Sequence, residues 1–205
     1  MKLIASSTLT VLVTFATLAA GAERPLPHGS PQDAELACIT MNTERLPLDS
    51  RRSPLDSVSF AIQGGMVKIC YGRTAARERE VYGELVPYDQ LWRTGANEPT
   101  MIHTSVALEV AGVRIDPGSY ALYTVPGKSE WEIIVNSSTT QWGHERFYND
   151  EIKAHEVGRG KAKSGSTDEY VESFTISAAT GEGGAATLYL EWEETRVAVP
   201  ISAAN

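Results

Sequence analysis

Hydrophobic and polar residues alternate along most of this chain after its first fifty residues. In residues 57–62 and again in residues 188–192, every second side chain is large and apolar. A period of two places these side chains on one face of a β-strand, whereas a helix needs a period near 3.6 residues. Segments of the same kind occupy residues 66–71, 104–110, 113–115, 120–125, 130–136, 169–177, 186–194 and 196–202. The pattern therefore predicts a protein built almost wholly from short strands.

Glycine and proline mark turns between these segments. Gly64 and Gly65 predict a two-residue hairpin loop, because glycine adopts positive φ without strain. Asp116–Ser119 has proline and glycine at the positions typical of a type II turn, which predicts positive φ at Gly118. Residues 144–154 are the one helix candidate, and it is short. We expect an all-β fold, an antiparallel β-sandwich of jelly-roll-like architecture with one short helix.

The chain of 205 residues divides into three parts. Residues 1–22 have Lys2, then an apolar run, then small residues at Ala20-Gly21-Ala22, which is typical of a cleaved signal peptide. Residues 23–52 contain four prolines and little periodicity, so we expect a tail or linker. Residues 53–202 carry the strand pattern and form the predicted β-sandwich domain. The protein is therefore expected to be exported, either to the periplasm or out of the cell.

The charge of the chain excludes some partners. There are 18 basic and 26 acidic residues, and the predicted signal peptide removes only Lys2, which leaves a net charge of −9 with histidine neutral. Phosphate backbones and anionic membrane surfaces attract proteins of the opposite sign. We therefore expect no nucleic-acid partner. The mature chain also has no segment long and apolar enough to span a bilayer.

The chain has two cysteines, Cys38 in the predicted tail and Cys70 in a predicted strand. An exported protein can hold a disulfide, and a bridge here would tie the tail to the core. Two free thiols, with Cys70 buried, are the alternative, because two cysteines in a sequence fix no geometry.

The segment Leu91–Thr100, "LWRTGANEPT", has an unusual order of residue types. Trp92 is suited to a core or a pocket wall, and Arg93 carries five donors in a rigid fork that matches a carboxylate or phosphate. Asn97 can bond its own backbone in an Asx-turn, and Glu98 is the carboxylate nearest to Arg93 in sequence. Either Glu98 saturates Arg93 in a structural corner, or Arg93 faces a shared polar site with Asn97 and Glu98, close to Arg73.

A basic element with arginines interleaved with glutamates, "GRTAARERE", starts at Gly72. Its arginines are Arg73, Arg77 and Arg79. The glutamates favour a solvated loop with internal ion pairs, which contribute little stability. The other interpretation is an anion cradle that faces Arg93.

His103 follows the polar segment at a distance of a few residues. Together with Arg93 it could serve acid–base chemistry, as could Glu98. A metal site from His103, His144 and Glu98 would have suitable ligand types but lacks any ligand spacing typical of metal motifs. We expect neither a metal nor a cofactor.

Three stretches together resemble a known family: residues 67–100, residues 112–136 and residues 188–201. Their shared marks are "VPYDQLWRTGAN", "DPGSYALYTVP" and "EWEIIVN". The sequence between Ser53 and Ile201 is similar to the bacterial domain of unknown function 2911. Thr74 and Glu78 depart from the family's usual proline and glycine. The resemblance implies an exported β-rich domain and supplies no catalytic residues.

Three functions are consistent with this sequence. The first is a non-catalytic domain that binds a small molecule or glycan, with candidate ligand-binding residues around the "WRTGANE" block. The candidate residues are Arg73, Trp92, Arg93, Asn97, Glu98 and His103. The second is a hydrolase that uses Arg93 with His103 or Glu98. The third is a structural or partner-binding domain of the cell envelope. The sequence does not fix whether the protein is an enzyme, and it does not fix the oligomeric state.

Overall fold

The computed structural model describes residues 36–204, so the predicted signal peptide and the first part of the predicted tail lie outside the described residues. Nine strands make up most of this region. They are β1 (Leu55–Ile62), β2 (Gly65–Gly72), β3 (Thr100–Thr104), β4 (Leu108–Val110), β5 (Val113–Ile115), β6 (Gly118–Val125), β7 (Glu130–Asn136), β8 (Glu156–Thr180) and β9 (Ala185–Ala203). The helical elements are short: η1 (Leu48–Ser50), η2 (Glu145–Phe147), α2 (Asp150–Lys153) and η3 (Glu182–Gly184). No described helix has the length and apolar character needed to cross a membrane.

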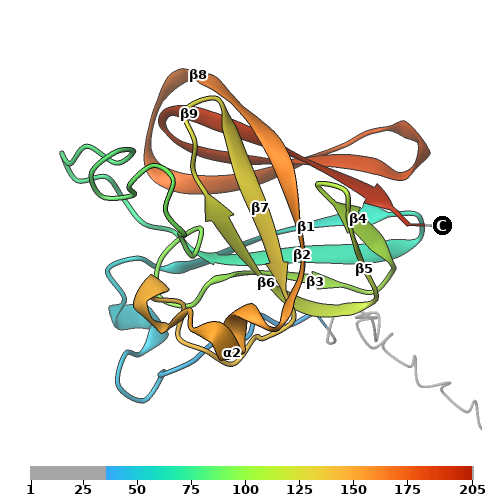
Figure 1. Ribbon diagram of the computed structural model, residues 1–205, viewed down its shortest axis with the longest axis horizontal. Helices are drawn as coiled ribbons and strands as arrows, with labels where there is room; N and C mark the ends of the chain where they lie inside the picture. The colour runs from blue at the N-terminus through green and yellow to red at the C-terminus, as the bar shows by residue number, and fades with distance from the viewer. Residues whose placement is uncertain (1–35, 205) are drawn as a thin grey trace, which may run out of the picture.

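All nine strands belong to one antiparallel sheet with the order β1-β2-β3-β6-β7-β8-β9-β4-β5. The sheet folds back over itself, so that β8 and β9 pass over the layer that holds β1, β2 and β3 (Figure 1). Buried apolar residues from every strand meet between the two layers in one core. The predicted all-β antiparallel fold with little helix is confirmed.

Strands β8 and β9 form one long hairpin, where the sequence had suggested three separate short strands. The first half of β8 escaped notice because its side chains are mostly exposed, with Ala162 the one buried residue in that half. Its backbone pairs with β7 on one side and with β9 on the other. Backbone pairing, rather than burial of alternate side chains, therefore extends this strand.

The predicted strand over residues 104–110 was wrong. The chain breaks it after Thr104, whose hydroxyl donates to the carbonyl of Val106 and accepts from its amide. β3 precedes the break and is buried at all five positions, so it lacks the alternation that marks a half-exposed strand. β4 and β5 then leave as a hairpin that pairs with β9, while β6 returns to pair with β3.

Two turn predictions also need correction. The first hairpin loop is Gln63–Gly64, with φ of 44° and 78°, so Gly65 already pairs with Ile62. Gly118 has the expected positive φ, but its value of 156° is far from the roughly 80° of a type II turn. Gly118 instead begins β6 opposite Thr104. Strand pairing on the β3 side therefore outweighs the local preference of the Pro-Gly sequence.

The N-terminal segment that precedes β1 is tied to the sheet. Cys38 and Cys70 form a disulfide with a Cα–Cα distance of 5.7 Å. Arg51, at the end of η1, is buried with a 6% exposed fraction. Residues 36–52, expected as part of a tail, are therefore held against the domain by the disulfide and by hydrogen bonds of Arg51 and Met41 to Glu98.

We predict that reduction of this disulfide lowers stability without unfolding the chain. The bridge spans 32 residues, and a loop of this length corresponds to about 3–4 kcal/mol of chain entropy in the unfolded state. Thermal denaturation with and without reductant should show a decrease in Tm of roughly 5–15 °C. The Cys38→Ser/Cys70→Ser variant should have the same Tm as the reduced protein, and reductant should not change the Tm of this variant. An unchanged Tm on reduction would contradict the prediction.

Candidate functional site

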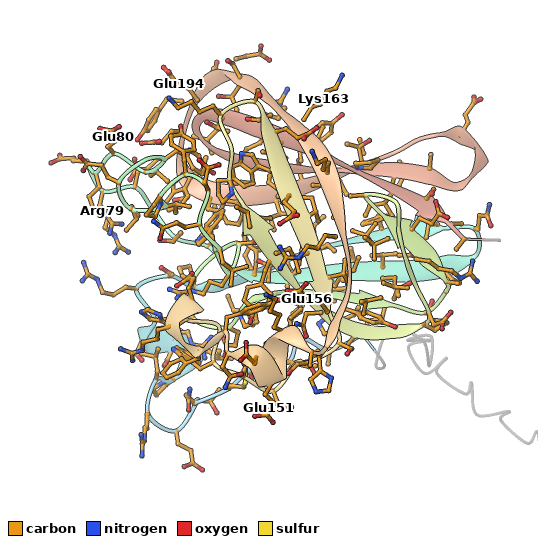
Figure 2. The ribbon with its side chains drawn as sticks, in the orientation of Figure 1. Arg79, Glu80, Glu151, Glu156, Lys163 and Glu194 are labelled. Carbon is orange, nitrogen blue, oxygen red and sulfur yellow. A yellow bond between two sulfur atoms is a disulfide. The ribbon has the colours of Figure 1, made fainter. Side chains whose placement is uncertain are left out.

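A cleft of about 540 Å³ opens at one end of the folded sheet, beside the loop that follows β2. Three parts of the chain form its walls: two stretches of the long connection between β2 and β3, namely the loop after β2 and the "WRTGAN" block, and the distant segment that leads into η2. The lining residues are Ser53, Thr74, Arg77, Arg79, Leu85, Val86, Pro87, Gln90, Leu91, Trp92, Arg93, Gly95, Ala96, Asn97, His144, Glu145 and Trp192. Figure 2 labels Arg79 on the projecting loop after β2, with Glu80 next to it.

Trp92 fixes the "WRTGAN" loop to the sheet. Its amide donates to the carbonyl of Thr124 in β6 (2.8 Å), and its carbonyl accepts from the amide of Thr124 (2.9 Å). Its ring stacks on Trp192 at 6.0 Å between centroids and meets Phe174 and Trp131 edge-on. The floor of the cleft is therefore continuous with the aromatic core.

The rest of this loop largely satisfies its own polar groups. Thr94 donates its hydroxyl to that of Thr124 (3.1 Å), and Thr100 donates its hydroxyl to the carbonyl of Thr94. Asn97 donates its side-chain amide to the carbonyl of Ser53 (2.9 Å). The residues Thr94 and Asn97 have positive φ, 60° and 65°, which such contacts must hold in place. These residues stabilise the loop itself, as the structural corner that was one of the two alternatives in the sequence requires.

The predicted pairing of Glu98 with Arg93 was wrong. Glu98 is 5% exposed, and both its oxygens accept from Arg51, at 2.7 and 2.9 Å. One of these oxygens also accepts from the amide of Met41. The buried, bidentate pair with Arg51 binds the Glu98 carboxylate more strongly than a pair with Arg93, its neighbour in sequence, would. Glu98 thus ties the N-terminal segment to the loop and does not line the cleft.

Arg93 pairs instead with Glu145, which comes from the opposite wall of the cleft. Nη1 of Arg93 lies 3.3 Å from one carboxylate oxygen, and the backbone amide of Arg93 donates to the other at 3.1 Å. Both side chains are partly exposed, at 22% and 30%. Nε of Arg93 is buried and has no hydrogen-bond partner among the described residues. The guanidinium therefore keeps donor capacity next to the cleft.

Two further arginines enter the cleft from the loop after β2. Arg77 and Glu78 both have positive φ, 53° and 61°, and the tight turn separates their side chains. Arg77 donates to the carbonyl of Arg52, while Arg79 donates to the carbonyls of Ala75 and Ala76. Within residues 36–204, neither Arg77 nor Arg79 forms an ion pair. The internal ion pairs expected for this basic element are therefore not present there.

Arg73 does not line the cleft. It lies 3.9 Å from Asp56 in an exposed pair, with exposed fractions of 45% and 42%. Its neighbour Thr74 lines the cleft and accepts through its carbonyl from the amide of Phe174. The loop turns inward only after Arg73, so the sequence placed the basic contribution a few residues too early.

His103 lies elsewhere in the sheet. It is 1% exposed in β3, and its Nδ1 is 2.8 Å from the hydroxyl of Ser119. Burial, with a smaller contribution from Lys68, lowers the pKa of His103 below its ordinary value, so the ring is neutral near pH 7. The structure brings neither His103 nor Glu98 into the Arg93 cleft. Among residues 36–204, no three potential metal ligands gather at one place.

A polar network on the outer face of β7 and β8 holds the wall that carries Glu145. Asn136 donates to the carbonyl of Ile152 (2.7 Å) and to the hydroxyl of Tyr148 (3.3 Å). Tyr148 donates to Glu156, which also accepts two hydrogen bonds from Arg159. The hydrogen bonds from Arg159 hold the pKa of Glu156 below its ordinary value, against a smaller opposing effect of burial. Figure 2 places Glu156 close to α2.

The sequence missed His144, Glu145 and Arg51 as partners in this region. His144 and Glu145 stand in the helix candidate, where their distance from residue 93 concealed the contact. The glycine at Gly143 was the one local sign of this contact. In the structure, a Cβ at Gly143 would collide with the backbone at Pro99. A glycine that another segment approaches so closely marks a contact, although it does not identify the partner.

We predict that loss of one partner of the buried pair is far more damaging than loss of an exposed pair. Arg51→Ala leaves the Glu98 carboxylate buried without its cation, which should cost about 3–5 kcal/mol of unfolding free energy. Lys161→Ala removes an exposed pair with Glu130 and should change the free energy of unfolding very little. Urea denaturation of both variants measures the difference. Equal losses would show that Arg51 is not held as the structure describes.

We also predict an acid-sensitive contribution from Glu156. A carboxyl whose pKa is lower in the folded than in the unfolded chain stabilises above the unfolded value of 4.5. This contribution is lost as pH falls through the folded pKa. The stability difference between wild type and Glu156→Gln should therefore be larger near pH 7 than near pH 3. Glu130→Gln, on an exposed pair, is the control with a small difference at both pH values. A difference for Glu156→Gln that does not change with pH would refute the assignment.

Comparison with known proteins places this geometry in a family context. None of the curated proteins and none of the solved structures matches the chain. The family model described as "Protein of unknown function (DUF2911)" matches residues 53–201, which contain all three walls of the cleft. Because the match covers well over half of the chain and agrees with the resemblance seen in the sequence, this protein belongs to the DUF2911 family.

Proposed function

We propose that this chain is an exported, non-catalytic protein that binds a small molecule, or the end of a glycan, in the cleft between Arg93 and the loop after β2. The observation that carries the proposal is the convergence of the β2–β3 connection and the distant segment around Glu145 on one cleft of about 540 Å³. Ligand sites commonly have volumes of about 300–1,000 Å³ and combine an apolar floor with a few polar groups. This cleft has such a floor at Trp92 and Trp192.

The backbone around the cleft supports the same proposal. Non-glycine residues with positive φ occur on both neighbouring walls, at Arg77 and Glu78 on one and at Thr94 and Asn97 on the other. Such conformations cost about 1–3 kcal/mol each and persist where the surrounding contacts impose them. Four of the nine described non-glycine residues with positive φ therefore lie on the walls of this cleft.

The disulfide supports export. Disulfides persist in oxidising compartments and are rare in the cytosol, where thiols are kept reduced. The bridge between Cys38 and Cys70 therefore agrees with the signal-peptide pattern of residues 1–22.

Binding without catalysis fits the site better than hydrolysis. The hydrolase hypothesis needs Arg93 together with His103 or Glu98, and neither His103 nor Glu98 lines the cleft that Arg93 lines. Glu98 is fully engaged with Arg51, so its oxygens are not available to a substrate.

A thermal-shift screen of the purified protein tests the proposal. The panel should contain neutral sugars, amino acids, small oxyanions and divalent metal salts. A compound that binds the native state at about 100 times its Kd adds roughly 2.7 kcal/mol of stability and raises Tm. If no class of compound raises Tm, the cleft is not a ligand site.

We predict that Arg93→Lys separates binding from folding. Lysine keeps the positive charge but cannot reproduce the planar fork of donors. The variant should retain a Tm close to that of wild type without ligand, and the ligand-induced rise in Tm should disappear. Arg196→Lys makes the same change at an exposed arginine outside the cleft, and it should retain the ligand-induced rise. If both variants respond to ligand like wild type, Arg93 has no part in binding.

A further inference from the structure

We propose that the ligand carries a small oxyanion, a carboxylate or a phosphate, which displaces Glu145 from Arg93. This inference rests on the function proposed above and adds the chemical class of the ligand. The chain as a whole is acidic, with 26 acidic against 18 basic residues. The cleft reverses this balance, since its lining has three arginines and one carboxylate, Glu145.

The two arginines of the β2 loop are not neutralised by protein carboxylates. In the described part of the chain, the guanidinium groups of Arg77 and Arg79 contact backbone carbonyls only. The carboxylate of Glu172 accepts from the amide of Arg77, and this contact holds the loop instead of the side chain. Carbonyl contacts fix the direction of a guanidinium and leave its full charge for a ligand anion.

The pair between Arg93 and Glu145 is weak compared with the structural pair in the same domain. Arg51 makes two short bonds to Glu98, at 2.7 and 2.9 Å, out of contact with water. Arg93 makes a single side-chain bond to Glu145 at 3.3 Å, longer than the usual 2.7–2.9 Å of a charge-assisted bond. Nε of Arg93 is buried without a partner among the described residues. An anion with two coplanar oxygens would satisfy donors that Glu145 leaves unused.

The position of Glu145 allows its side chain to move away from Arg93. Glu145 begins η2, an element of three residues. Among residues 36–204, the hydrogen-bond and ion-pair partners of its carboxylate are Arg93 and the ring of His144, which is 3.5 Å away. The wall that carries it is anchored elsewhere, through Asn136 and Tyr148. Rotation of the Glu145 side chain toward solvent therefore leaves the anchors of the wall in place.

Neutral sugars fit the same cleft less well. Sugar sites commonly offer an exposed aromatic ring as a stacking surface, and an exposed arginine-rich rim favours charge instead. The aromatic rings that line this cleft, Trp92 and Trp192, are only 6% and 1% exposed. The accessible chemistry of the cleft is therefore that of the arginines.

The test uses matched probes that differ in charge. D-glucuronate and D-glucose share a ring and differ in a carboxylate, while succinate and inorganic phosphate separate carboxylate from phosphate recognition. Each is titrated into the purified protein at low salt by calorimetry, with amide NMR shifts of Arg77 and Arg93 as the local readout. We expect saturable binding of at least one of the three anions and none of glucose.

Variants then assign the role of each group. Glu145→Gln removes the competing carboxylate and should tighten anion binding several-fold, whereas Arg79→Gln should weaken it about tenfold or more. Lys161→Gln removes one positive charge outside the cleft and should leave affinity unchanged within about twofold. Within the described residues, the side chain of Arg79 hydrogen-bonds backbone carbonyls alone. Arg79→Gln therefore tests the proposal even if Glu145→Gln does not fold.

Each contrary result has a definite meaning. Saturable glucose binding at the cleft with no binding of the anions would overturn the oxyanion proposal and leave the proposed binding function standing. Weaker anion binding by Glu145→Gln would overturn displacement of Glu145. If neither the anions nor glucose binds while another neutral compound raises Tm in the screen, the oxyanion proposal is again wrong. If no compound of any class binds, the proposed function fails as well.

Discussion

The packing of Trp92 against the aromatic core is the contact on which the rest of the site depends. Its backbone bridges to Thr124 in β6, and its ring lies against Trp192, Trp131 and Phe174. Aromatic pairs at these distances add roughly 0.5–1.5 kcal/mol each beyond the area they bury. An irregular loop placed on such a support has one conformation, so the next residue, Arg93, leaves the core in a fixed direction.

The two arginine–glutamate pairs of this domain show how burial separates structural from functional roles. The pair of Arg51 with Glu98 is out of water, bidentate and shared with the amide of Met41, so both charges are fully used. The pair of Arg93 with Glu145 is partly exposed and uses one side-chain bond. Water and ions compete for the second pair and not for the first, because solvent screening acts only where solvent reaches.

The positive cleft on an acidic chain follows from the backbone of two loops. In "RERE", arginine and glutamate alternate, and the local sequence gives no reason to expect one sign on one side. The turn at Arg77 and Glu78 separates the two kinds of side chain, so that Arg77 and Arg79 line the cleft and the glutamates do not. The local charge of a cleft can therefore oppose the net charge of the whole protein and select ligands of the sign opposite to the local charge.

Local patterns in the sequence were sufficient to predict a strand-rich fold. Alternation in β1 and β9 predicts strands because each has one buried face. The same rule missed β3, which is buried on both faces, and the first half of β8, in which one face is exposed and the other is half-buried, with Ala162 its one buried residue. The resemblance to DUF2911 was also visible in the sequence, since the "WRTGAN" block is short and contiguous.

The sequence alone determined that the chain is β-rich, that it belongs to a family marked by the "WRTGAN" block, and that Arg93 and Asn97 are candidates for a polar site. Only the tertiary structure decided the partners of these residues. Glu98 lies five residues from Arg93 and pairs with Arg51, while Glu145, far along the chain, pairs with Arg93. Strand alternation depends on neighbours within a few residues, whereas an ion pair depends on which loops the folded sheet brings together and how much water it excludes from them.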